Sequence, residues 1–381
     1  MSTNFVYLDH AATTAQRPEV LAEMAPYFDE RFGNPSSTHR WGRQARNALE
    51  QARERVAAVL GAGRREIVFT GGGTEADNIA VLGRWRSACR GNGSAAVVCS
   101  AIEHKAVGAA AQCAADEGAQ LIIVGVDEQG LVLMDALDEA LAAQPCVVSV
   151  MWANNEVGTI QPVADIGARC RDAGVVFHTD AVQGFGKLRV RVDETPCDLL
   201  SLSAHKVAGP KGIGALYIRE GTGVLPLVHG GGQERDLRPG TENVAAAAGF
   251  AVAAELAAAE QEEEAARLSG LRDRLEAGIR AITPGIVVNG APDARLPNIL
   301  NISVPGTDSE TLLIGLDLEG VAASGASACA SGAVKPSHVL QAMGAVRDGY
   351  ASVRLSLGRT TAPPDIEFAI SAFAAVMPTD A

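Results

Sequence analysis

Residues able to act together in catalysis follow predicted strands in the middle of the chain. Lys206 comes just after the apolar run DLLSLS, beside His205, and Asp180 ends the run VVFHTD. A glycine-rich turn, GGGTEADN, leads into a predicted helix at Thr74. A lysine amine can bond covalently to a carbonyl, a buried carboxylate needs a cation or a metal, and a glycine turn before a helix offers N–H groups to an anion. The candidate chemistry is therefore that of an amine, an acid and an anion site.

Each of these residues also has an ordinary structural explanation. Thr74 could be a plain helix cap, and Lys206 a surface lysine just past a strand. However, the chain has only five lysines among its 32 basic residues, and all three features lie at strand ends. Since α/β folds bind ligands at the carboxyl ends of their strands, the features should meet there. Pyridoxal phosphate needs this combination: an anion site, a carboxylate for its ring nitrogen and an amine for a Schiff base.

The elements that must position these residues alternate along the chain. Short β-rich runs cover residues 66–70, 95–100, 120–126, 146–152, 175–180 and 198–203, with helical patterns between them. Over 40–60, apolar residues step by three and four and Gly61 follows, which predicts an amphipathic helix. Strands that alternate with helices indicate an α/β fold with a mostly parallel, doubly wound sheet.

The pattern changes near residue 243, where a long Ala/Glu-rich helix is predicted to run to about residue 282. Short strands and shorter helices follow it, which is typical of a smaller α+β unit. Because 381 residues exceed the usual size of one core, we expect two domains. Residues 16–259 form the large cofactor-binding domain in this interpretation, and residues 1–15 with 260–381 form the small domain that carries the loop around Cys329.

Charge and composition exclude several classes of protein. The net charge of −13 argues against nucleic acid or an anionic membrane as a direct partner. The first residues lack the basic and apolar regions of a secretory signal, and the longest apolar runs are far shorter than the ~20 residues that cross a bilayer. No CxxC pair occurs among the seven cysteines. We expect a soluble, cytoplasmic protein with no metal site of its own.

Taken together, the motifs resemble those of cysteine desulfurases of the NifS/IscS-like type, in the class V aminotransferase branch of fold-type I pyridoxal-phosphate enzymes. The resemblance covers nearly the whole chain in order. The matching segments are YLDHAATT (7–14), FGNPSSTH (32–39), FTGGGTEADN (69–78), IEHKAV (102–107), NNEVGTIQP (154–162), HTDAVQ (178–183), SLSAHKVAGPKGIGALY (201–217), GGGQERDLRPGTEN (230–243), SGASACASG (324–332) and VRLSLGR (353–359).

The resemblance implies a role for each matching residue. Lys206 would hold the cofactor covalently, Asp180 would pair with its ring nitrogen, and His104 would stack on the ring and move protons. Arg354 would grip the substrate carboxylate, with Asn155 beside both cofactor and substrate. The remaining cofactor contacts would come from Gly73, Thr74, Gln183, Ser203, His205 and, in a homodimer, Thr241 of the partner subunit.

Cys329 distinguishes the desulfurases from related aminotransferases, which need no thiol at this position. In the desulfurases the cysteine takes sulfur from L-cysteine as a persulfide, releases L-alanine and passes the sulfur to an acceptor protein. An iron–sulfur scaffold is the expected acceptor, and Cys329 could transiently contact a nascent cluster. We expect the other six cysteines to be buried, since they lie in apolar patterns.

Three alternatives remain at this point. The chain could be a selenocysteine lyase, another class V aminotransferase, or a catalytically silent homologue that acts as a scaffold. The acceptor also stays open between iron–sulfur assembly, tRNA thiolation and DNA sulfur modification, because the donor chemistry is common to all of them.

Overall fold

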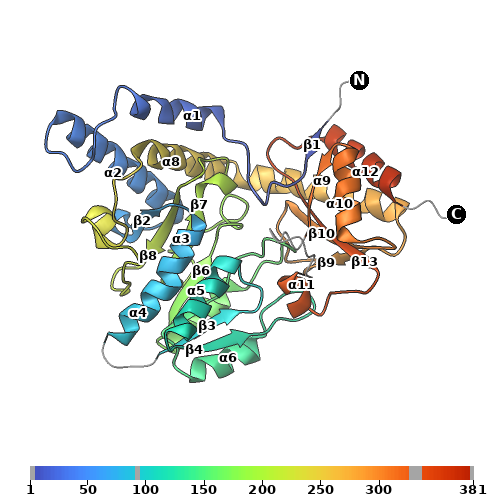
Figure 1. Cartoon of the computed structure of the whole chain (residues 1–381), viewed down its shortest axis with the longest axis horizontal. Helices are drawn as coiled ribbons and strands as arrows, with labels where there is room; N and C mark the ends of the chain where they lie inside the picture. Colours follow the sequence, from blue (N-terminus) through green and yellow to red (C-terminus); the bar gives the residue numbers. More distant parts are fainter. Residues whose placement is uncertain (1–4, 91–94, 326–336, 378–381) are drawn as a thin grey trace.

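The computed structural model describes residues 5–90, 95–325 and 337–377. Two sheets of different size organise this part of the chain, and each packs against its own apolar core (Figure 1). The larger sheet is formed by residues from the first two thirds of the chain, and the smaller one lies in the last third.

The larger sheet is mostly parallel, as the sequence predicts. Its seven strands lie in the order β2-β8-β7-β6-β5-β3-β4, and only β8 runs antiparallel to its neighbours. The central strands are buried on both faces, which explains their continuous apolar runs. The strands are β2 (Ile67–Thr70), β3 (Ala96–Ser100), β4 (Gln120–Val124), β5 (Val147–Ser149), β6 (Val176–Asp180), β7 (Leu199–Ser203) and β8 (Gly214–Ile218).

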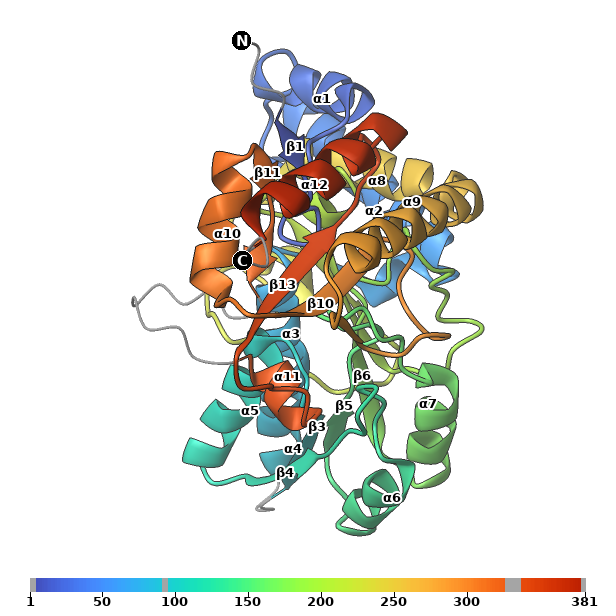
Figure 2. The ribbon, with the colours of Figure 1, turned by 90° about the vertical axis from the view of Figure 1, so that its right-hand side faces the viewer.

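Helices cover this sheet on both sides, with α5 and α7 on opposite faces (Figure 2). The predicted helix at 40–60 is α2, whose Leu49 and Val56 are buried and which ends at Gly61 with φ +70°. The helices of this part are α1 (Pro18–Met24), α2 (Arg40–Leu60), α3 (Gly73–Asn78), a π-helical turn (Ile79–Gly83), α4 (Arg84–Cys89), α5 (Lys105–Asp116), α6 (Met134–Ala142), α7 (Val163–Asp172) and α8 (Val244–Ala259).

The prediction of one long helix over 243–282 is wrong. Two helices, α8 and α9 (Gln261–Ile282), meet at Glu260 with a bend of 70°. The Arg17 guanidinium binds the Glu260 carboxylate at the bend, a contact over 243 residues of sequence that periodicity does not reveal. Among the described residues no single helix is long and apolar enough to cross a membrane, and only this bent pair reaches that length jointly.

The smaller sheet is antiparallel, in the order β12-β13-β10-β9. Its core includes residues of α9, α10 and α12. The elements here are β9 (Val287–Asn289), β10 (Ile299–Pro305), α10 (Ser309–Leu318), β11 (Val321–Ala322), β12 (Ser324–Gly325), α11 (His338–Ala342), β13 (Tyr350–Ser356) and α12 (Pro363–Val376).

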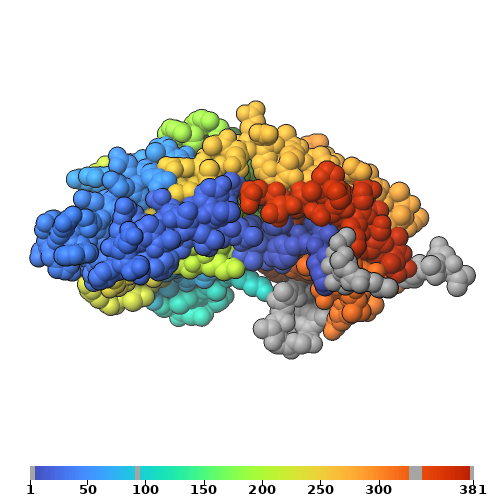
Figure 3. Space-filling view, turned by 90° about the horizontal axis from the view of Figure 1, so that it is seen from above, coloured from blue at the N-terminus to red at the C-terminus, as the bar shows by residue number. Residues whose placement is uncertain are grey.

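The N-terminal segment connects the two parts of the molecule. Its strand β1 (Val6–Tyr7) pairs with β11 beside the small sheet, whereas α1 packs against α8 of the large part. In Figure 3 the blue residues run along the surface from α1 toward the small sheet. Conversely, Val339 and Leu340 of α11 belong to the core of the large sheet.

A buried ion pair holds the edge strand β2 in place. The guanidinium of Arg53 on α2 binds both carboxylate oxygens of Glu234, at 2.6 and 2.7 Å, and the two side chains are 3% and 2% exposed. Arg53 also donates to the carbonyl of Ile67, and Glu234 accepts the N–H of Phe69. Since β2 leads into the glycine turn before α3, this pair positions one wall of the predicted site.

We expect the variant Arg53→Met to lower the free energy of unfolding by about 3–5 kcal/mol, because it leaves the Glu234 carboxylate buried without a counter-ion. Urea denaturation followed by circular dichroism measures this. The double variant Arg53→Met/Glu234→Leu should recover part of the loss. The exposed pair of Arg189 and Glu194 is the control, and Arg189→Ala should leave the urea midpoint unchanged. Equal losses in the buried and exposed variants would contradict this account.

Candidate active site

A cavity of about 430 Å³ lies at the carboxyl ends of β6 and β7, the edge at which α/β sheets bind ligands. Its volume is in the range of about 300–1,000 Å³ that is usual for small-molecule sites. Ten residues that the sequence singled out line it together: Gly73, Thr74, His104, Asn155, Asp180, Gln183, Ser203, His205, Lys206 and Arg354.

Lys206 ends the short 3₁₀ turn η4 (Ala204–Lys206) that follows β7. Its Nζ donates to the main-chain oxygens of Ala11 and Ala12, the latter at 2.8 Å. Burial, with a smaller effect from Arg354, lowers the pKa of the amine from 10.5 to about 8. At pH 7 about a tenth of this amine is therefore uncharged, far more than for a lysine of ordinary pKa, and the uncharged form is the one that attacks a carbonyl.

Asp180 and His104 both line the cavity, with a carboxylate oxygen and a ring nitrogen within 4.8 Å of each other. Asp180 is 5% exposed, and its Oδ1 accepts the N–H of Val182 at 2.8 Å. Burial raises the pKa of Asp180, while His104, this N–H and Lys206 oppose the rise. The Nδ1 of His104 accepts the N–H of Ala106 at the start of α5, so the proton of the neutral ring is on Nε2. Burial lowers the pKa of His104, which keeps the ring neutral near pH 7.

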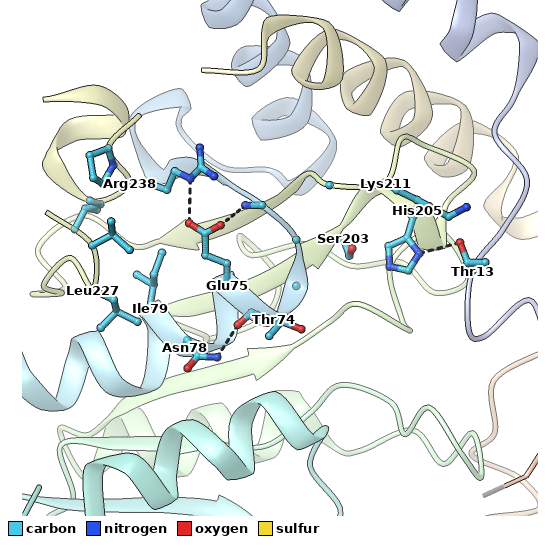
Figure 4. A pocket seen from close by; sticks show the side chains of 17 residues that line it. Thr13, Thr74, Glu75, Asn78, Ile79, Ser203, His205, Lys211, Leu227 and Arg238 are labelled. Atoms are coloured by element: carbon cyan, nitrogen blue, oxygen red, sulfur yellow. Dashed lines mark hydrogen bonds and ion pairs between the residues drawn. The ribbon is translucent and has the colours of Figure 1, made fainter. Parts of the chain in front are cut away.

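Gly73, Thr74, Ser203 and His205 line both this cavity and a second, larger one of about 870 Å³. Figure 4 shows Thr74, Ser203 and His205 in the larger cavity. N–H groups at the start of a helix and nearby hydroxyls suit a phosphate. A larger residue at position 73 would force a neighbour to shift, because a Cβ there would come within 2.8 Å of Val182 Cγ2.

His205 supports this cradle as a neutral ring. Its Nδ1 lies 3.1 Å from Thr13 Oγ1, and burial together with three lysines lowers its pKa to about 4. On the far side of the turn, Glu75 accepts the N–H of Gly71 and binds Arg238 at 3.0 Å, as Figure 4 shows. The turn is thereby fixed from both sides.

Gln183 presents an unsatisfied group to the cavity. Its Nε2 donates to the carbonyl of Ala11 at 2.9 Å, and its Oε1 has no hydrogen-bond partner among the described residues. The side chain is 5% exposed. A buried amide oxygen without a partner costs free energy, so this atom is available to a hydroxyl of a bound ligand.

Arg354 reaches the cavity from β13 of the small sheet and is 7% exposed. Its Nη2 binds Asp9 Oδ1 at 2.7 Å, and its Nη1 donates to the carbonyl of Asn155 at 2.9 Å. Its Nε is buried and has no partner within the described ranges. The guanidinium is therefore held in place by two other segments and keeps donors for a carboxylate.

Of the two remaining predicted site residues, Thr241 does not line this cavity and Cys329 is not among the described residues. Thr241 is exposed and lines neither cavity of its own chain, although Leu237, Arg238 and Pro239 nearby line the larger one. Cys329 lies outside the described residues, between Gly325 of β12 and Ser337 before α11.

Four of the other six cysteines are buried, as expected, and two are not. Cys99, Cys146, Cys170 and Cys197 are buried, and burial raises the pKa of each thiol. The prediction is wrong for Cys89 and Cys113, which are half-buried. Cys113 lies toward the end of α5 at the margin of its buried face, where it packs against the core and its Sγ contacts Glu117.

Sequence reasoning missed several side chains at the site. Asp9 stands in the quoted segment YLDHAATT, but nothing local indicates that it binds Arg354. His338 donates from Nε2 to the carbonyl of Glu103 at 2.9 Å and lines the cavity beside His104. Asp77 and Glu156 line it as well. Polar residues inside the helical pattern 74–78 were the only available signal for Asp77.

Comparison with known proteins places this site in a family. Residues 6–368 match the family described as aminotransferase class-V. The chain is 45% identical to a cysteine desulfurase IscS of Clostridium botulinum (strain Hall) over 96% of its length and 92% of that protein. The chain therefore belongs to the class-V aminotransferases and, within them, to the cysteine desulfurase family.

Solved structures of similar proteins have the same fold as this chain. A NifS-like protein superimposes with a TM-score of 0.91 at 35% identity, over 98% of this chain and 99% of the other. A structure of SspA in complex with cysteine superimposes with a TM-score of 0.80 at 34% identity, over 92% and 98%. Fold-type I architecture, predicted from the resemblance, is confirmed by these neighbours and by the mostly parallel sheet.

We expect Gly73→Ala to weaken the binding of pyridoxal phosphate by about tenfold, because the added Cβ displaces Val182 or the start of α3 from the cradle. Binding of pyridoxal, which has no phosphate, should change much less. Equilibrium dialysis of both compounds measures this. The control is Gly108→Ala on α5, where a Cβ meets nothing within 4 Å. A Gly73→Ala protein that loses affinity for both compounds equally would contradict a phosphate cradle at this turn.

Proposed function

We propose that this chain is a pyridoxal-phosphate-dependent enzyme that converts L-cysteine to L-alanine and captures the sulfur as a persulfide on Cys329. The observation that carries the proposal is the convergence of Lys206, Asp180 and Arg354 with a phosphate-type cradle on one cavity, in a chain related to cysteine desulfurases.

The residues of the cavity fit this cofactor. The cradle of Gly73, Thr74, Ser203 and His205 would hold its phosphate, and Asp180 would pair with the protonated ring nitrogen. Gln183 Oε1, which has no hydrogen-bond partner in the described part of the chain, would accept a hydrogen bond from the ring hydroxyl. When bound, pyridoxal phosphate supplies an electron sink that stabilises negative charge at the α-carbon of an amino acid.

Lys206 and His104 are the groups that would hold and move protons. Lys206 with a pKa of about 8 accepts or releases a proton near neutral pH, and the carbonyls of Ala11 and Ala12 orient its Nζ. His104 lines the cavity as a neutral ring whose proton is on Nε2. Lys206 thus exchanges a proton near neutral pH, whereas His104 is neutral at pH 7 and would take a proton only transiently, during the reaction.

Arg354 would bind the α-carboxylate of the substrate. The contacts with Asp9 and the Asn155 carbonyl hold its guanidinium before substrate arrives, so little side-chain entropy is lost on binding. Asn155 lines the same cavity and would contact both substrate and cofactor.

Sulfur transfer is assigned to Cys329. The C–S bond of L-cysteine breaks as the Cys329 thiolate forms an S–S bond, so that L-cysteine and a thiol yield L-alanine and a persulfide with no outside oxidant. The thiolate is the attacking form of the cysteine. The persulfide then passes to an acceptor, for which we propose an iron–sulfur scaffold protein.

We also propose a homodimer in which Thr241 of the partner subunit completes the phosphate site. The larger cavity joins the cradle and is lined by apolar Ile79, Leu227 and Val228, and a second chain could fill it. Large exposed apolar side chains support an interface on the N-terminal part of the chain: Phe28, Phe32 and Trp41 are 70%, 69% and 51% exposed.

Lys206→Ala should abolish the visible absorbance of the bound cofactor and all turnover, since Lys206 is the lysine whose charge acts on Asp180. Lys211→Ala, in the following glycine-rich loop, is the control and should retain both. In the wild type, the rate of cofactor uptake by cofactor-free protein should rise with pH, reach half its maximum near pH 8 and level off above about pH 9, because the uncharged amine is then the main form. Covalent cofactor retained by Lys206→Ala but lost in Lys211→Ala would overturn the assignment.

Cys329→Ser should keep the cofactor and still bind L-cysteine, because Asp180, Lys206 and Arg354 are unchanged. Alanine release should fall at least about 100-fold, since a serine hydroxyl is a far poorer nucleophile toward sulfur than a thiolate. Amino-acid analysis after incubation with L-cysteine measures this, with Cys113→Ser as the matched control. Alanine release by Cys329→Ser at the wild-type rate would refute the proposed function.

If Thr241 reaches the phosphate of the partner subunit, cofactor binding and dimerisation are linked. Removing the cofactor should then weaken the dimer, and dilution should weaken cofactor retention. Analytical ultracentrifugation of both forms over a concentration series tests this, with Thr241→Ala as the variant that should reduce the linkage. A monomer that retains cofactor as tightly as the dimer would contradict the shared site.

A further inference from the structure

A second buried carboxyl lies beside Asp180. Asp77, on α3, is 1% exposed, and a carboxylate oxygen of each aspartate and a ring nitrogen of His104 all lie within 4.8 Å of one another. Asp77 lines the same cavity as Asp180. Two buried carboxylates at such a separation cannot both ionise without strong repulsion.

The surroundings of the two acids differ. Asp180 accepts the N–H of Val182 and faces the positive charge of Lys206, and both stabilise its ionised form. Asp77 has only a hydrogen bond to the Ser201 hydroxyl, and its buried Oδ1 has no hydrogen-bond partner within the described part of the chain. The negative charge is therefore more favourable on Asp180.

The nearest ring does not neutralise Asp77. The Nε2 of His178 lies 3.8 Å from Asp77 Oδ1, beyond hydrogen-bond distance. His178 is fully buried, and its nitrogens contact Ser149 Oγ at 2.8 Å and Ser201 Oγ at 3.0 Å. Burial lowers the pKa of this ring to about 3, so it is neutral at physiological pH.

The other titratable groups around Asp77 also disfavour a charge there. The buried carboxyl of Glu103, between β3 and α5, is held by Ser100 and by the N–H of Met151. Together with Asp180 it raises the pKa of Asp77, but burial is the largest cause. His104 is neutral, as described above.

We propose that Asp77 is a positioning residue that stays protonated and thereby keeps a single negative charge, on Asp180, facing the cofactor ring. Its proton is donated to Ser201 Oγ, the Ser201 hydroxyl donates to His178 Nε2, and His178 Nδ1–H donates to Ser149 Oγ. This chain of hydrogen bonds satisfies both nitrogens of the buried ring. The inference rests on the proposed cofactor site for its role, but the protonation of Asp77 is a property of this chain alone.

The first test compares Asp77→Asn with Asp180→Asn in the full-length protein with pyridoxal phosphate. Asparagine has the shape of the neutral acid, so Asp77→Asn should bind the cofactor within about threefold of the wild type. Asp180→Asn removes the charge and should weaken binding by about 100-fold. Equilibrium dialysis and the visible spectrum measure both. A loss in Asp77→Asn as large as that in Asp180→Asn would overturn the proposal, whereas a wild type that binds no cofactor would instead refute the proposed function.

The second test needs no cofactor. An acid whose pKa is raised in the folded state costs stability that grows as pH rises above its unfolded value of about 3.9. Relative to wild type, Asp77→Asn should therefore gain about 1–3 °C in melting temperature per pH unit, beginning above pH 4. The control is Asp116→Asn, at an exposed position on α5. Its melting temperature should differ from that of the wild type by the same amount at every pH.

Asp77→Leu is also uncharged and of similar shape. If the asparagine variant does not fold, the melting temperature of Asp77→Leu can be measured against pH in its place. The proposal is overturned if the melting temperature of the variant, relative to wild type, stays constant or falls between pH 5 and 8. Either result would show that Asp77 is ionised. The proposal is supported if the melting temperature of either variant rises relative to wild type as pH increases.

Discussion

The structure depends on burying an amine and a carboxylate on adjacent strands. Lys206 follows β7 and Asp180 ends β6, strands that pair in parallel. Parallel pairing brings both carboxyl ends to one edge, so two charged groups reach the same water-poor cavity. Burial lowers the pKa of the Lys206 amine to about 8 and raises that of Asp180, while their mutual attraction opposes both shifts. The amine thereby becomes more reactive near neutral pH, and Lys206 and the N–H of Val182 favour the charged form of the acid.

The substrate side of the cavity depends on a different kind of contact. Arg354 comes from the small antiparallel sheet, Asp9 from the N-terminal segment and Asn155 from a turn of the large part. These three segments must dock before the guanidinium is held. Substrate binding is thus coupled to the packing of the small sheet against the large one, whereas the cofactor cradle belongs to the large sheet alone.

The sequence predicts most of the local arrangement, because strand ends and glycine turns have local signatures. The parallel sheet, the helix ending at Gly61 and the convergence of Gly73, Asp180 and Lys206 follow from such patterns. The bend at Glu260 and the Arg354–Asp9 contact do not, since each depends on a partner far away in sequence, 345 residues in the second case. Asp77 shows the same limit, because its neighbour Asp180 lies on another element and only folding brings the two acids together.

The central claim is that sulfur leaves L-cysteine for one particular thiol. The most direct measurement is a single turnover of the purified protein with ³⁴S-labelled L-cysteine, followed by mass-spectrometric mapping of persulfides and quantification of alanine. The account predicts one labelled sulfur on Cys329 and one alanine per subunit. Labelled sulfide free in solution with Cys329 unmodified, or label on Cys89 or Cys113 instead, would contradict it.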